Sequence, residues 1–125
     1  MNLGYLSLLV AEIPMWITCM VEQGEINFTT FRHAEIKTNA QLVEHFDKNM
    51  EGVKKALQHV TDASLQENFY LKNGDTVLMS VKKLDYIGPT INHWIHHRGQ
   101  LTVYMRISEI PVPSIYGPSG DEKNF

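Results

Sequence analysis

The sequence predicts a single all-α domain, an up-and-down helical bundle of three long helices with one small β-hairpin. Helical patterns cover three long segments, residues 3–21, 39–60 and about 81–109. One strand-like segment, residues 68–80, has an Asn-Gly pair between two short runs rich in Tyr, Leu, Val and Thr. With 125 residues, 43% of them hydrophobic, the chain is long enough for one core and too short for two. We therefore treat residues 1–125 as one domain.

The first predicted helix, LGYLSLLVAEIPMWITCMV (3–21), has only one charged residue, Glu12. Its length nearly spans a bilayer, so a membrane-anchored protein is one alternative. However, no Lys or Arg precedes it, and a carboxylate near the middle of a span costs about 2.5–3.5 kcal/mol. We therefore expect a core helix surrounded by other helices. It should kink at Pro14, because proline cannot donate to the carbonyl of Val10.

The middle of the chain is expected to contain a loop followed by the most regular helix. Residues 25–37 show no sustained period and are expected to form a loop. Thr38 and Gln41 have capping-box spacing at the start of the helix over residues 39–60. A short helical turn over residues 61–67 then leads into the hairpin.

The last long helix carries two apolar or aromatic stripes. At 100° per residue, one stripe contains Ile87, Ile91, Trp94, Arg98, Leu101 and Met105, and the other contains Tyr86, His93, His97, Gln100, Tyr104 and Ile107. A helix with two such faces is expected to be covered twice, by the domain interior and by a partner subunit or another part of the chain. Pro111 and Pro113 should end it, and Tyr116 is expected to anchor the tail to the core.

Composition argues against several classes of partner. The net charge of −3, the pI near 6.0 and the scattered Lys and Arg residues provide no basic patch for nucleic acid. A single cysteine, Cys19, cannot form an internal disulfide and fits a reducing compartment. We therefore expect a cytoplasmic protein with no nucleic-acid or membrane partner.

Half of the six histidines lie in NHWIHHRGQ, residues 92–100. His93 and His97, hereafter the histidine pair, are four residues apart, so their rings can occupy adjacent sites on one metal ion. His96 lies about 100° away and is expected at the surface. The alternative is a solvated, His-rich helix face. Two protein ligands are few, since catalytic zinc usually has three, and Trp94 excludes the zinc-protease motif.

The run NHWIHHRGQLTVYMRISEIPVPSIYGPSGDE (92–122) resembles the DinB family, also called DinB/YfiT-like metalloenzymes. The stretch LGYLSLLVAEIPMWI (3–17) is similar to the second helix of that family, and the resemblance covers nearly the whole chain. It implies a four-helix bundle, commonly dimeric, with a divalent metal held by three histidines. Some members are thiol-cofactor-dependent transferases or isomerases. The usual first helix of the family is absent, which indicates either an internal start codon or a partner subunit that supplies the missing cover.

The resemblance places two of the family's ligands on the histidine pair. The family's remaining histidine ligand corresponds to Leu9, whose side chain cannot bind a metal. Glu12, three residues further along the helix, is a possible substitute ligand. Its alternative is a partly buried acid paired with Arg98 or Arg106. The remaining histidines are expected to be solvated: His33, His45 and His59.

Two functions from different classes therefore remain open. The first is a divalent-metal protein (zinc, nickel or iron) built on the histidine pair, with a hydrolytic or thiol-dependent reaction on an unidentified small molecule. The second is a helical homodimer or interaction protein that has lost the metal site and catalyses nothing. Arg98 and Gln100 are expected to contact substrate or to serve as packing and capping groups.

Overall fold

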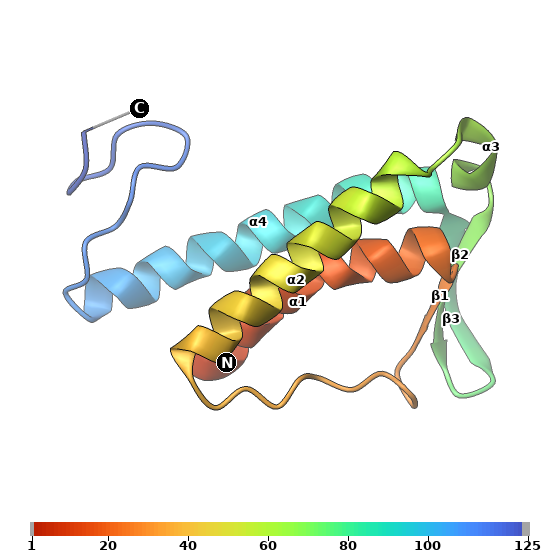
Figure 1. The fold of residues 1–125 in the computed structure, drawn as a ribbon, viewed down its shortest axis with the longest axis horizontal. Helices are drawn as coiled ribbons and strands as arrows, with labels where there is room; N and C mark the ends of the chain where they lie inside the picture. Colours follow the sequence, from red (N-terminus) through yellow and green to blue (C-terminus); the bar gives the residue numbers. More distant parts are fainter. Residues whose placement is uncertain (1, 124–125) are drawn as a thin grey trace.

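The computed structural model describes residues 2–123 and is mostly helical, as predicted (Figure 1). It contains three long helices, α1 (Leu3–Glu22), α2 (Asn39–Gln58) and α4 (Lys83–Ile107), and one short helix, α3 (Asp62–Leu65). Three strands, β1 (Glu25–Asn27), β2 (Asn68–Asn73) and β3 (Thr76–Lys82), form one small sheet. The bounds of the long helices lie within two residues of the predicted ones.

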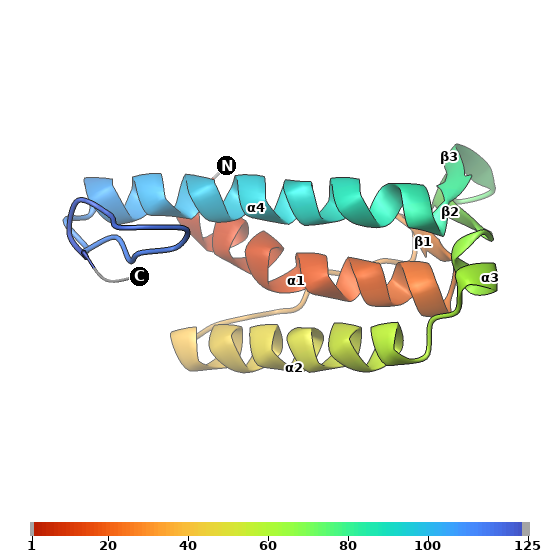
Figure 2. The same ribbon diagram turned by 90° about the horizontal axis from the view of Figure 1, so that it is seen from above.

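The helix α1 lies in the middle of the fold, with α2 on one side and α4 on the other (Figure 2). Helices α1 and α2 run in the same direction and α4 runs against them (Figures 1 and 2). The connection from β1 to α2 therefore travels back along the length of the helices, so the topology departs from a strict up-and-down order. At the start of α2, Thr38 and Gln41 form the predicted capping box.

Pro14 lies within α1, and α1 bends along its length (Figure 2). Proline lacks the N–H that would bond to the carbonyl of Val10, and the indole Nε1 of Trp94 donates to that carbonyl oxygen at 2.9 Å instead. The next carbonyl, of Ala11, accepts from Asn49 Nδ2 at 2.9 Å. The proline thus frees the Val10 carbonyl for a bond to α4, and the bond from Asn49 fastens α1 to α2 one residue further along.

By length and composition, α1 is the one helix within residues 2–123 that could cross a membrane. In the fold its two flanking helices cover it, and both Glu12 and Ile13 are fully buried. Most of the buried apolar residues belong to this helix: Leu6, Leu9, Ala11, Ile13, Ile17 and Met20. This placement is typical of the core helix of a globular domain.

The sheet corrects one prediction. Residues 25–37 were expected to form a loop throughout, but Glu25–Asn27 is a strand that pairs in parallel with β2. A three-residue strand is too short to show an alternating pattern, and its pairing depends on residues more than 40 positions away. The hairpin between β2 and β3 is confirmed, with Gly74 at φ +62° in its turn. Ile26 packs with Met20 and Phe69 in a core cluster under the sheet.

The C-terminal segment, residues 108–123, folds back beside the end of α4 (Figure 1). The Asp121 carboxylate accepts from the Arg106 guanidinium and from the Val112 N–H, at 3.0 and 2.9 Å. The prediction that Tyr116 anchors the tail in the core is wrong, because its side chain is 79% exposed. Its hydroxyl accepts from Arg98 at 2.5 Å, so the tyrosine fastens the tail from the outer surface of the helix.

Candidate metal centre

The histidine pair projects from one face of α4, as the four-residue spacing predicts. The Nε2 atoms of His93 and His97 lie 2.7 Å apart, and the ring centroids are separated by 4.5 Å. At this distance the two nitrogens share a hydrogen bond through one proton. Two imidazole nitrogens that converge in this way can take neighbouring positions on one metal ion, since each Zn–N bond is about 2.0–2.1 Å long.

His97 is the buried member of the pair, with 7% of its surface exposed. Its other ring nitrogen, Nδ1, lies 2.7 Å from the amide oxygen Oε1 of Gln100. His96 is exposed, as expected, and its ring meets the edge of the His97 ring at 5.1 Å. The contact with Gln100 was not predicted, although the three-residue spacing on a helix could have indicated it.

His93 is half-buried, and its ring lies 5.6 Å from the ring of Trp16 on α1. Burial lowers the pKa of His93 below its ordinary value, and the nearby charges of His97 and His96 lower it further. The ring is therefore neutral at neutral pH, which is the form that binds metals.

The third ligand position implied by the resemblance does not supply a donor. Leu9 is buried, with 6% of its surface exposed, and an isobutyl group cannot coordinate a metal. Within residues 2–123, no group of three or more His, Cys, Asp or Glu side chains is arranged to hold a metal ion. The donors present fit a two-nitrogen chelate and do not fit a three-histidine centre.

Glu12 is fully buried, and its carboxylate is committed to the connection between β1 and α2. One oxygen accepts from the backbone N–H of Ala34 at 2.8 Å, and the other lies 2.5 Å from Nδ1 of His33. The proposed pairing with an arginine is therefore wrong, because Arg98 bonds to Tyr116 and Arg106 to Asp121. These contacts engage both carboxylate oxygens of Glu12, and its role as a substitute ligand stays a prediction.

The expectation that three further histidines are solvated holds for His59, which is exposed. It is wrong for His45, whose side chain is 19% exposed and whose Nε2 lies 3.6 Å from Glu12 and 3.2 Å from Asn49 Nδ2. His33 is partly open to solvent, at 39% of its side chain, but it is paired with Glu12. A buried carboxylate attracts such partners, and sequence periodicity does not show which loop residue reaches it.

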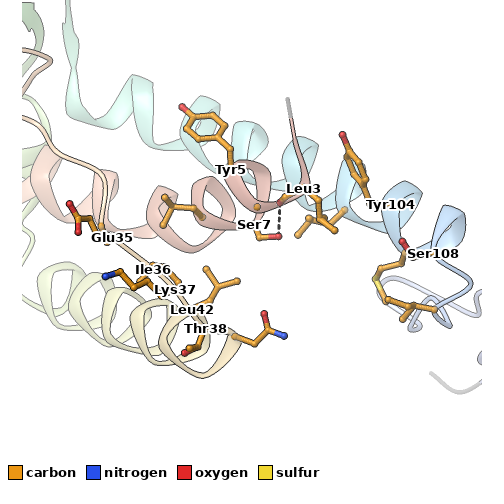
Figure 3. A pocket seen from close by; sticks show the side chains of 17 residues that line it. Leu3, Tyr5, Ser7, Glu35, Ile36, Lys37, Thr38, Leu42, Tyr104 and Ser108 are labelled. Carbon is orange, nitrogen blue, oxygen red and sulfur yellow. Dashed lines mark hydrogen bonds between the residues drawn. The ribbon is translucent and has the colours of Figure 1, made fainter.

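An open, mainly apolar groove of about 890 Å³ lies near the start of α1 (Figure 3). Its walls come from the first turns of α1 and α2, from residues 34–38 and from the last turns of α4. On α4 the lining begins at Leu101 and includes Tyr104, one and four residues beyond Gln100. The groove therefore starts about one helical turn from the histidine pair.

Comparison with known proteins gives a family from the sequence and a similar fold from the structure. Residues 5–123 match the DinB family. The uncharacterized protein YrdA of Bacillus subtilis (strain 168) is 34% identical over 94 residues, which cover 70% of this chain and 50% of YrdA. The crystal structure of YjoA, a DinB-like protein from Bacillus subtilis, is similar with a TM-score of 0.67 at 18% identity, over 99% of this chain and 76% of that one. The chain thus spans half the length of the curated relative that it matches.

Proposed function

Because this chain belongs to the DinB family, whose members are generally associated with metals, we propose that it binds a divalent transition metal through His93 and His97 alone. The supporting observation is the 2.7 Å approach of the two Nε2 atoms on one face of a rigid helix. A bound ion would supply Lewis-acid chemistry or lower the pKa of a coordinated water. Such an ion would serve a hydrolytic or thiol-dependent reaction on a small molecule. The free thiol of Cys19 favours the cytoplasm as the compartment.

The donor count sets the expected affinity. Structural zinc sites with four protein ligands contribute about 10–16 kcal/mol, so two ligands should contribute roughly half, about 5–8 kcal/mol. This corresponds to a Kd of roughly 1–200 µM. Zinc, nickel and iron all accept imidazole, so the proposal does not depend on one of them.

The test is a zinc titration of tag-free protein by calorimetry, together with the metal content by elemental mass spectrometry. The native chain should bind one equivalent in the micromolar range, and His97→Ala should abolish binding. His96→Ala is the matched control, since it removes an adjacent histidine on a different face and should retain the affinity. Equal affinity of the native and His97→Ala proteins would refute the proposal.

The burial of Leu9 favours a second candidate, a non-catalytic homodimer that has lost the metal site. A buried leucine completes the core where a ligand would otherwise stand, which suits a protein retained for its surface. Exposed apolar residues on α4 offer such a surface: Leu84, Ile91 and Ile95. Sedimentation equilibrium of the metal-free protein tests this candidate. A dimer without zinc binding would support it, and a monomer would exclude it.

A further inference from the structure

We propose that Gln100 is a positioning residue that holds His97 in the Nδ1–H tautomer and so presents the lone pair of His97 Nε2 to a metal. The consequence for metal binding rests on the proposed function, whereas the tautomer is a property of the metal-free protein. The two parts can therefore be tested separately.

The orientation of the Gln100 amide assigns the position of the proton in this proposal. The Gln100 atom nearest His97 Nδ1, at 2.7 Å, is the amide oxygen Oε1, which can only accept a hydrogen bond. His97 Nδ1 must then donate and carry the proton. A neutral imidazole has one N–H, so Nε2 of His97 holds a lone pair. Because only 7% of the His97 surface is exposed, water has little access to compete for the hydrogen bonds of its two ring nitrogens.

The same reasoning identifies the donor and the acceptor in the hydrogen bond between His93 and His97. The Nε2 atoms are 2.7 Å apart and one of them must donate. Since His97 Nε2 accepts, His93 Nε2 carries the proton of this bond. To bind a metal, His93 has to move its proton to Nδ1, while His97 needs no change. His97 is thus already in the tautomer that binds a metal, whereas His93 has to change its tautomer.

Metal ligands in proteins are commonly oriented in this way. A ligating histidine usually donates its second ring N–H to a carboxylate or carbonyl oxygen, and loss of that acceptor typically costs 10–100-fold in affinity. Here the acceptor lies three residues along the same helix, so helix geometry places it within reach of His97. Gln100 is exposed, and its replacement therefore leaves the buried core intact.

The experiment uses the full chain labelled with ¹⁵N-histidine. Long-range ¹H–¹⁵N spectra of the metal-free protein, recorded where the histidines are neutral, report the tautomer of each ring. We expect the Nδ1–H form for His97 in the native protein and in Gln100→Glu, which keeps an acceptor. Gln100→Leu should shift His97 towards the Nε2–H form. Gln58→Leu, at the exposed end of α2, is the control and should leave the spectrum of His97 unchanged.

A zinc titration of the same variants completes the test. Gln100→Leu should weaken zinc binding by roughly 10-fold or more, and Gln100→Glu should not weaken it. An Nε2–H tautomer of His97 in the native protein, or no change in Gln100→Leu, would overturn the proposal, as would unchanged zinc affinity in Gln100→Leu. If the tautomer shifts as expected but the native chain binds no zinc, the assignment of Gln100 stands and the proposed metal function fails.

Discussion

Replacing Glu12 tests whether its buried carboxylate fastens the connection between β1 and α2. In Glu12→Leu the backbone N–H of Ala34 loses its acceptor, which costs about 1–3 kcal/mol for a group removed from water. The hydrogen bond from His33 is lost as well, worth about 1.5–3 kcal/mol when one partner is charged. His33 is partly exposed and can turn to water, so we discount that contribution. The expected loss in the free energy of unfolding is about 2–4 kcal/mol.

Glu12→Gln separates the shape of the side chain from its charge. A glutamine keeps an oxygen for the Ala34 N–H, and His33 must then accept from the new amide group. We expect a loss of about 1 kcal/mol. At about 4 °C per kcal/mol for a chain of this size, the melting temperature should fall by roughly 8–16 °C in Glu12→Leu and roughly 4 °C in Glu12→Gln.

Urea unfolding followed by circular dichroism, together with thermal melts, measures both variants. Glu51 provides a control, because it is an exposed acid on α2 whose partner is Lys55 one turn away. Glu51→Ala should leave the unfolding midpoint nearly unchanged. If Glu12→Gln were as destabilising as Glu12→Leu, the Ala34 contact would contribute nothing and the reasoning would be refuted.

Three further predictions concern the metal centre, the core and the tail. Leu9→His should raise the zinc affinity by at least 10-fold, because it supplies a third imidazole where the family has a ligand. Leu8 lines the groove, so Leu8→His is the control and should not raise the affinity. Equal gains of the two variants in calorimetry would contradict this geometry. Phe69→Ala, at a side chain that is 1% exposed, should cost about 3–5 kcal/mol in urea unfolding, and a loss below 1 kcal/mol would mean that the cluster under the sheet is loosely packed. The hydrogen bond from Arg106 lowers the pKa of Asp121, so this contact stabilises the tail above the ordinary Asp pKa and is lost as the pH falls through the lowered value. The protection factors of the amides in residues 108–123, which compare each exchange rate with the intrinsic rate at the same pH, should therefore fall in acid. Asp121→Asn should show low protection factors at neutral pH as well.

The long helices and the hairpin could be predicted because their signals are local. The capping box at Thr38 and the Asn73-Gly74 turn each specify a structure within a few residues. The strand β1 could not be predicted in the same way, because it forms only when β2 is beside it. The direction of α2 relative to α1 depends on the path of the connection between them, which periodicity does not encode.

In the candidate centre, too, the local geometry could be predicted and the long-range contacts could not. The joint projection of His93 and His97 follows from helix geometry and is confirmed. The partners of Glu12 and His45 come from other segments of the chain, and the arginine pairing that charge alone suggested was wrong. Sequence reasoning identified the residues of opposite charge but could not determine which of them the fold brings within reach.

The proline in α1 also determines how far the helices can slide. Apolar helix faces in contact tolerate displacement by one turn, about 5.4 Å, with little change in buried area. A hydrogen bond from Trp94 to the one carbonyl that Pro14 leaves free cannot be satisfied after such a shift. The bond of Asn49 to the next carbonyl imposes the same condition on α2. A residue that weakens the helix locally thereby selects a single alignment of three helices, and in that alignment His93 stands against Trp16.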